Sequence, residues 1–228
     1  MTLKLYYWNY QGKAHMVRIL LKYLNLDFEE INPKDREDWA QLEQSFIDQG
    51  FLLPNLPLLV DGDFRLSESV AILRYLAEKY GDGTLLGKTV EDRAVVNQLL
   101  GVLADVQGII ATAMFDKEYK AALEKTLEPE NKLHEKLQGL ADFLGEKEFL
   151  LGYFTIADVW LGPLVVMFNS IYKSAGVKDP FKQKAIYDHA IRMTRQPGIK
   201  EFYDSGEVDN SIICEKDWLK NHPYVYEH

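Results

Sequence analysis

The stretch that decides the fold of this 228-residue chain runs from Pro54 to Ser69 and reads PNLPLLVDGDFRLSES. Its apolar runs at Leu58–Val60 and Phe64–Leu66 flank Asp61-Gly62-Asp63, a pattern that predicts two antiparallel strands joined by a tight turn. The polar triplet Ser67-Glu68-Ser69 then precedes apolar residues at helical spacing. We therefore expect a hairpin followed directly by a helix.

The residues before this stretch alternate between the periods of strands and helices. Leu3, Leu5 and Tyr7 alternate with other residues as in a strand, and apolar side chains recur at helical spacing between Ala14 and Leu24. A weaker strand is expected over residues 26–31 and a short helix over 39–46. Together with the quoted stretch, this order predicts a small α/β domain over residues 1–82.

The second half of the chain shows no clear strand pattern. Gly81-Asp82-Gly83-Thr84 breaks the chain, and long apolar stripes at helical spacing follow it. Thr155-Ile156-Ala157-Asp158 has the layout of a capping box and opens a helix with few charges, which we expect at the centre of its domain. The sequence predicts an all-α domain over residues 90–228, with helical patterns at 95–110, 133–144, from 155 onward and at 181–195.

The composition argues against several classes of protein. The net charge is −9, and no basic run offers a surface to nucleic acid or to an anionic membrane. No run approaches about eighteen apolar residues, and the N-terminus lacks the apolar core of a signal peptide. The single cysteine, Cys214, suggests a reducing compartment, and the five histidines show no metal-ligand spacing. We expect a cytoplasmic protein without a metal.

Two features of the quoted stretch each have a structural and a functional interpretation. Pro57 is either an ordinary trans proline where a loop meets a strand, or a cis proline that leaves the backbone of Leu56 free to pair with an extended peptide. Ser67 or Ser69 is either a plain helix N-cap, or part of an anion site beside Glu68. In the functional alternative, Ser69 would hold the carboxylate of an amino acid and Glu68 its ammonium group.

Five motifs follow one another along the chain: Tyr7-Trp8-Asn9-Tyr10-Gln11-Gly12, Ala14-His15-Met16-Val17-Arg18, Pro54-Asn55-Leu56-Pro57, Ser67-Glu68-Ser69-Val70-Ala71-Ile72 and Phe154-Thr155-Ile156-Ala157-Asp158. In this order they resemble the cytosolic glutathione S-transferases of the mu-like and sigma-like classes, over nearly the whole chain. The resemblance implies a thioredoxin-like α/β N-terminal domain followed by an all-α C-terminal domain. It also implies a homodimer that uses reduced glutathione as co-substrate and needs no cofactor.

The resemblance also implies where glutathione binds. Pro57 matches the family's cis proline, and Leu56 matches the residue whose backbone contacts the cysteinyl unit. Glu68 and Ser69 match the residues that hold the γ-glutamyl end. Asp105 resembles an aspartate that reaches the γ-glutamyl group bound to the partner subunit. The remaining contacts implied by the resemblance are Trp8, Lys13, Trp39 and Asn55.

The chain departs from the family where the glycine carboxylate of glutathione binds. The family usually places a lysine a few residues after the tryptophan that Trp39 matches, but residues 40–53 contain no lysine or arginine. The family's arginine before the glycine is Gln11 here. The side chains that could supply the missing contact are those of Gln44, Gln49 and Lys13.

Glutathione conjugation requires a thiolate, because the thiol is the poorer nucleophile. A tyrosine hydroxyl can donate a hydrogen bond to that sulfur while staying neutral near pH 7. The strand period places Tyr7 on the face shared with Leu3 and Leu5, and the family motif selects the same residue. Tyr7 is therefore the predicted catalytic residue, and a core tyrosine at a strand end is the structural alternative. Cys214 is not expected to act as a nucleophile.

The predicted electrophile site is an apolar cleft between the two domains. Its expected walls are Tyr10, Met114, Phe115 and the C-terminal tail with Trp218, although plain helix packing would equally explain Met114 and Phe115. The predicted function is conjugation of glutathione to hydrophobic electrophiles in detoxification. Two alternatives stay open, namely a glutathione-dependent isomerase of the sigma-like type and a non-catalytic protein of the same fold that carries hydrophobic ligands.

Overall fold

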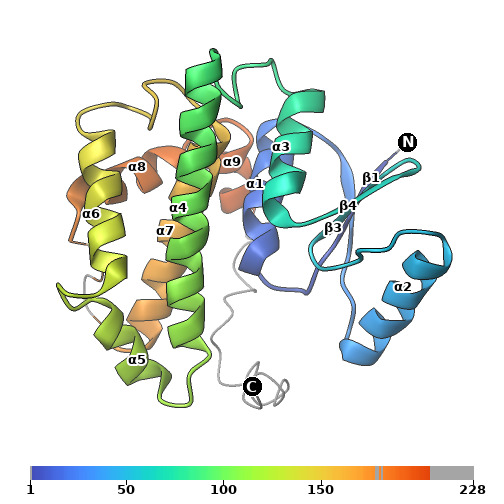
Figure 1. Cartoon of the computed structure of the whole chain (residues 1–228), viewed down its shortest axis with the longest axis horizontal. Coiled ribbons are helices and arrows are strands. Elements are labelled where there is room, and N and C mark those ends of the chain that lie inside the picture. The colour runs from blue at the N-terminus through green and yellow to red at the C-terminus, as the bar shows by residue number, and fades with distance from the viewer. Residues whose placement is uncertain (1, 178–179, 181, 206–228) are drawn as a thin grey trace. The chain divides into compact units, whose positions relative to one another are not determined.

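The computed structural model describes residues 2–177, 180 and 182–205, which divide into two compact units (Figure 1). The first unit comprises residues 2–83 together with 197–205, and the second comprises the described residues of 84–196. The sequence analysis assigned all of 90–228 to the helical domain, whereas residues 197–205 group with the first unit. Cys214 and Trp218 lie outside the described residues.

The first unit is built on a four-stranded sheet with the strand order β2-β1-β3-β4. Strand β1 pairs parallel to β2 and antiparallel to β3, which pairs antiparallel to β4. Figure 1 shows α1 and α3 on one side of this sheet and α2 on the other. The arrangement confirms the thioredoxin-like α/β domain. Its elements are β1 (Leu3–Tyr6), η1 (Gly12–Ala14), α1 (His15–Tyr23), β2 (Phe28–Ile31), α2 (Arg36–Asp48), β3 (Leu58–Asp61), β4 (Phe64–Ser67), α3 (Ser69–Tyr80) and α9 (Ile199–Asp204).

Helix α1 buries nearly its whole apolar stripe, as its spacing predicted. Val17, Leu20 and Leu21 are fully buried, and α1 packs on α3. Helix α2 starts earlier than its apolar pattern because the Asp35 carboxylate accepts a hydrogen bond from the Asp38 backbone N–H at 2.8 Å. Local capping thus extends an element whose periodicity is weak.

The sequence analysis did not predict α9. Ile199 and Phe202 are buried, and α9 packs on α1 of the same unit. Gly198 precedes it with a φ of +77°, and a Cβ there would overlap the Lys22 carbonyl of α1. Six residues are too few to show a helical period, so only the contact with α1 reveals this helix.

The second unit contains only helices among its described residues, which confirms the all-α prediction. They are α4 (Val90–Met114), α5 (Tyr119–Thr126), α6 (Lys132–Leu144), α7 (Ile156–Ser174) and α8 (Lys184–Met193). Helix α7 is almost entirely buried and packs on α4 and α8. Its capping box is present, with Thr155 as N-cap and Asp158 returning the bond. Helix α5 was not predicted, because its eight residues carry a weak pattern.

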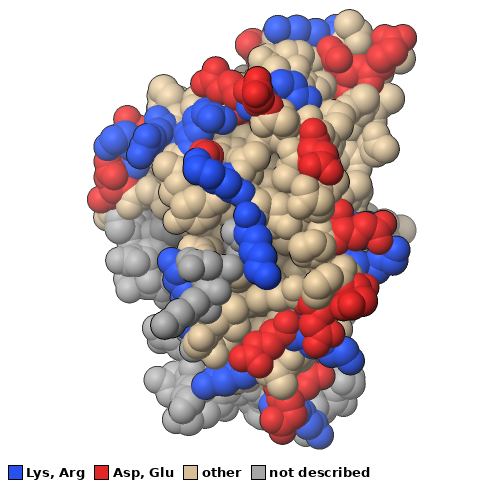
Figure 2. Space-filling view, turned by 90° about the vertical axis from the view of Figure 1, so that its left-hand side faces the viewer, with Lys and Arg blue, Asp and Glu red and all other residues tan. Residues whose placement is uncertain are grey.

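Helix α4 is, among the described helices, the one with the length and apolar composition of a membrane span. Its apolar side, which includes Leu99, Leu103 and Ile110, is buried against other helices of the second unit. A core helix of this kind meets the same criteria without a membrane. Figure 2 shows basic and acidic side chains interspersed on one face of the molecule, which offers no extended surface of a single charge.

Candidate functional site

Sheet register brings three separate segments to one end of the first unit. Tyr6, the last residue of β1, pairs with Leu58 at the start of β3, and Leu58 pairs with Ser67 at the end of β4. The residues just after β1, just before β3 and just after β4 therefore gather at the same end of the sheet. These are the segments that hold Tyr7, Pro57 and Glu68.

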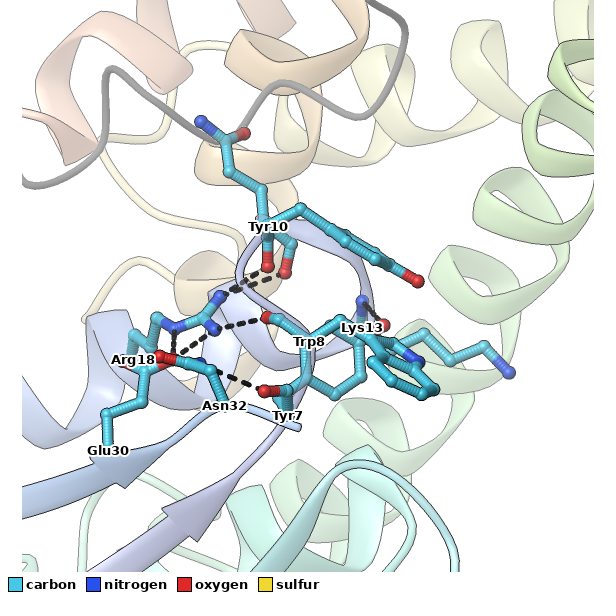
Figure 3. A network of polar contacts seen from close by, with 8 residues as sticks. Tyr7, Trp8, Tyr10, Lys13, Arg18, Glu30 and Asn32 are labelled. Carbon is cyan, nitrogen blue, oxygen red and sulfur yellow. Dashed lines mark hydrogen bonds and ion pairs between the residues drawn. The ribbon is translucent and has the colours of Figure 1, made fainter. Parts of the chain in front are cut away.

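The Tyr7 side chain is buried, with 5% of its surface exposed. Its hydroxyl oxygen accepts a hydrogen bond from the backbone N–H of Lys13 at 2.8 Å (Figure 3). Burial raises the pKa of Tyr7, although the Lys13 N–H, a side-chain hydrogen bond with Tyr10 and the charge of Arg18 all act in the opposite direction. The hydroxyl thus keeps its proton at neutral pH and is equipped to donate it in a hydrogen bond.

Gly12 allows the chain to pass close to that hydroxyl. Its φ is +42°, and a Cβ at this position would overlap the Tyr7 hydroxyl oxygen and the Tyr10 ring. The Tyr7 and Tyr10 rings meet edge to face, with centroids 5.4 Å apart. The turn after β1 is therefore a close fit around the Tyr7 side chain, and it requires glycine.

Arg18 holds this turn through hydrogen bonds and was not among the site residues predicted from the sequence. Its guanidinium donates to the carbonyls of Trp8, Tyr10 and Gln11 and to the carboxylate of Glu30 (Figure 3). One signal could have indicated it. A buried arginine on the apolar stripe of a helix needs several partners, and α1 carries Arg18 between Val17 and Ile19.

The Leu56–Pro57 peptide bond is cis, as the second of the two interpretations of Pro57 requires. The pairing of the Leu56 backbone with an extended peptide stays a prediction. Pro57 is buried and Leu56 is half-buried. The Leu56 backbone N–H donates to the Asn55 side-chain oxygen at 2.9 Å, and the Asn55 amide donates to a Glu68 carboxylate oxygen at 3.3 Å. The fold thus brings Asn55, Leu56 and Glu68 together from segments thirteen residues apart.

Glu68 occupies the N-cap position of α3, so neither neighbouring serine is a plain N-cap. The Glu68 side chain makes no capping bond, and Ser67 donates instead to the Leu53 carbonyl at 2.7 Å. The Glu68 backbone has a φ of +72°, which costs a non-glycine residue about 1–3 kcal/mol. An exposed glutamate kept in this conformation beside the buried Ser69 at a helix N-terminus points to a binding role.

Comparison with known proteins agrees with this geometry. The model of the glutathione S-transferase N-terminal domain matches residues 1–78. Glutathione S-transferase 2 of Gallus gallus is 32% identical over 159 residues, which cover 67% of this chain and 68% of that protein. The chain belongs to the glutathione S-transferase family.

Two further relatives refine this result. The class-mu 26 kDa isozyme 7 of Fasciola hepatica is 34% identical over 154 residues, or 67% of this chain and 66% of that protein, just under two thirds of its length. The crystal structure of the glutathione S-transferase Blo t 8 superposes with a TM-score of 0.77 at 25% identity, covering 93% of this chain and 97% of that one. Within this family, the chain is similar to the mu class.

The three side chains that could bind the glycine carboxylate of glutathione differ in the contacts that they make in the structure. Gln44 donates to Asp48 at 2.8 Å, and Gln49 accepts from Arg65 at 2.6 Å. Both amides are therefore already engaged on or beside α2. The Lys13 side chain is exposed at the turn beside Tyr7.

The other predicted residues lie on helices. Trp39 is half-buried on α2, and Asp105 is exposed on α4, where it pairs with Lys136 of α6 at 2.8 Å. Met114 is buried at the end of α4, as plain helix packing requires, and Phe115 follows it half-buried. No group of three or more side chains able to hold a metal ion occurs in the part of the chain that the structure describes.

Proposed function

We propose that this chain is a glutathione transferase that joins the sulfur of reduced glutathione to hydrophobic electrophiles in the cytoplasm. The observation that carries the proposal is the convergence of the Tyr7 hydroxyl, the Leu56–Pro57 backbone and the Glu68–Ser69 helix start at one end of the sheet. An extended tripeptide with a thiol in its middle matches these three groups. The relatives named above are called glutathione S-transferases, which supports the transferase over the isomerase.

Each group of the tripeptide has a partner of suitable chemistry. The Leu56 backbone pairs with the cysteinyl unit, as an added strand would. The Glu68 carboxylate takes the γ-glutamyl ammonium group. The Ser69 hydroxyl and the positive N-terminus of α3 take the neighbouring carboxylate. Lys13 supplies the charge for the glycine carboxylate, and the outer contacts come from Trp8, Trp39 and Asn55.

The reaction needs one donor at the sulfur. The thiol of bound glutathione gives its proton to solvent, and the Tyr7 hydroxyl donates a hydrogen bond to the thiolate that remains. The thiolate then attacks the electrophilic carbon, forms the thioether bond and expels the leaving group. Tyr10, whose ring meets that of Tyr7, is the proposed aromatic contact of the electrophile. No cofactor enters this scheme.

A direct test combines binding with turnover. Calorimetry should show that the purified protein binds reduced glutathione, and 1-chloro-2,4-dinitrobenzene should be converted to the thioether, which is followed by its absorbance. Glu68→Ala should weaken the binding of glutathione but leave that of cysteinylglycine, which lacks the γ-glutamyl group, unchanged. Binding without any turnover would support the non-catalytic alternative, and absence of binding would contradict the proposal.

A further inference from the structure

We infer that Arg18 and Glu30 are positioning residues of this transferase, which hold the turn after β1 so that it aims the Tyr7 hydroxyl at the sulfur of glutathione. The inference rests on the proposed function of Tyr7. Neither side chain needs to touch glutathione for this role. Both act on the Tyr7 hydroxyl through the backbone of the turn.

The Arg18 guanidinium is the hub of the network in Figure 3. Its Nη1 donates to the carbonyls of Tyr10 at 2.8 Å and Gln11 at 3.2 Å, and its Nη2 donates to that of Trp8 at 3.3 Å. Its Nε donates to Glu30 Oε1 at 2.8 Å, and its Nη2 contacts the same oxygen. One planar group thus ties three carbonyls of a short turn to strand β2.

Asn32, the residue directly after strand β2, holds the fourth carbonyl. The Asn32 amide donates to the Tyr7 carbonyl at 2.9 Å and to Glu30 Oε1 at 3.2 Å. Glu30 Oε1 therefore accepts from both Arg18 and Asn32, and it is the shared anchor of the network. Losing this one oxygen would loosen the turn at both of its ends.

The turn after β1 fixes the position of the Tyr7 hydroxyl. The Lys13 N–H that contacts the hydroxyl oxygen comes two residues after Gln11, the last residue whose carbonyl Arg18 holds. A Cβ on Gly12, which lies between them, would overlap the same oxygen. Because the hydroxyl oxygen accepts a hydrogen bond from the Lys13 N–H, the hydroxyl has a restricted choice of directions for its proton. A shift of this turn would misdirect the donor without removing it, and hydrogen bonds weaken steeply with angle.

The charges around Arg18 allow positioning to be distinguished from direct electrostatics, because the two change the pKa of the bound thiol in opposite directions. Its guanidinium carbon lies 5.6 Å from the centre of the Tyr7 ring. His15, also near it, is neutral, because burial and the charge of Arg18 lower its pKa to about 3. Glu30 is thus the counter-charge of Arg18. Without Glu30, the unbalanced positive charge would by itself lower the pKa of the bound thiol, whereas a loosened turn raises it.

The experiment compares Glu30→Ala and Glu30→Gln with Glu29→Ala, the neighbouring glutamate of β2, whose partner is the exposed Lys4. The thiolate absorbance of the glutathione complex is titrated in each protein. We expect Glu30→Ala to raise the thiol pKa by roughly half a unit to one unit and to lower turnover near pH 6.5 about three- to tenfold, with recovery at higher pH. Glutathione affinity should change less than about twofold.

The conservative variant and the control separate positioning from other roles. Glu30→Gln keeps an acceptor oxygen and should give a thiol pKa close to that of the wild type. Arg18→Lys keeps the positive charge but loses the planar guanidinium with its several N–H donors, so it should resemble Glu30→Ala. An unchanged or lowered thiol pKa in Glu30→Ala, or an equal rise in Glu29→Ala, would overturn the inference. If the wild-type protein does not lower the thiol pKa of glutathione, the proposed function of Tyr7 is contradicted. That outcome differs from a failure of the inference, in which the wild-type protein lowers the thiol pKa but Glu30→Ala does not raise it.

Discussion

At the scale of single residues, the Tyr7 hydroxyl combines burial, a hydrogen bond accepted from the Lys13 N–H and a raised pKa. If it donates to the bound sulfur, it helps to bring the thiol pKa from about 8.5 toward 6.5, or roughly 2.7 kcal/mol. One hydrogen bond to a charged group supplies about 1.5–3 kcal/mol. Tyr7→Phe should therefore raise the thiol pKa by most of that amount and reduce turnover near pH 6.5 by roughly ten- to a hundredfold.

The pH dependence of Tyr7→Phe checks this role. The rate should recover partly as the pH rises and the thiol ionises without help, while the affinity for glutathione should hardly change, because the peptide contacts lie at Leu56, Glu68 and Ser69. Ultraviolet titration of the thiolate in both complexes gives the measurement. Equal thiol pKa values in the two proteins would make Tyr7 a structural residue.

Gly12 is the second residue on which the site depends. In Gly12→Ala the methyl group would overlap the Tyr7 hydroxyl oxygen, at a φ that L-residues rarely adopt. We expect a loss of turnover of at least about tenfold and a lower melting temperature. Gly139→Ala on α6, where nothing lies within 4 Å, is the matched control and should be neutral or stabilising by roughly 0.5–1 kcal/mol. A fully active Gly12→Ala would show that the turn can relax.

At the scale of elements, Asp61 joins the end of β3 to helix α3. Its carboxylate accepts hydrogen bonds from the hydroxyls of Tyr75 and Tyr80, both at 2.7 Å, and from Lys79. Burial is the largest single effect and opposes ionisation, but the three hydrogen bonds together lower the pKa of Asp61. Asp61→Asn should therefore destabilise the first unit by roughly 1–3 kcal/mol near pH 7.

The sign of the pH effect follows from the lowered pKa of Asp61. A carboxyl with a lower pKa in the folded state adds stability that is complete above its unfolded pKa and is lost as the pH falls through the folded value. Urea unfolding of wild type and Asp61→Asn should therefore differ near pH 7 and converge below about pH 4. A constant difference across that range would contradict the assignment.

The start of α7 is the second element held by one carboxylate. Asp158 accepts from the backbone N–H groups of Thr155 at 2.9 Å and Leu150 at 2.8 Å, and it pairs with the buried His189 of α8 at 2.9 Å. Asp158→Ala leaves these buried partners without an acceptor and should cost about 3–5 kcal/mol of stability. The exposed Asp142→Ala, measured by the same urea titration, should cost less than about 0.5 kcal/mol. Similar losses in both would remove the special role of Asp158.

At the scale of the whole molecule, we predict a homodimer. Leu52 and Leu53 are adjacent and 79% and 78% exposed, a large apolar area to leave in water. Light scattering at micromolar concentration should give twice the chain mass of 26.3 kDa. Replacing both leucines by serine should weaken the dimer, whereas Phe143→Ser, at 40% exposure on α6, should not. A stable wild-type monomer would contradict the prediction and the role across subunits proposed for Asp105.

The sequence by itself determined what depends on near neighbours along the chain. Alternation and helical spacing predicted the four strands, helix α1, helix α3 and the long helices, because these patterns need only a few consecutive turns or residues. The capping box at Thr155 and the glycine-containing turn at Gly62 are local for the same reason. Tyr7, Pro57, Glu68 and Ser69 could be selected because each stands at the end of such an element.

Only the tertiary structure decided what depends on residues distant in sequence. Four features of the site and fold leave no repeating pattern in the sequence. They are the hydrogen bond from Arg18 to the Glu30 carboxylate, the left-handed backbone of Glu68, the cis Leu56–Pro57 bond and the burial of α9 against α1. Each depends on how the segments around it pack in the folded unit. A contact between distant segments depends on the whole packing around it, so the pattern of either segment alone does not contain it.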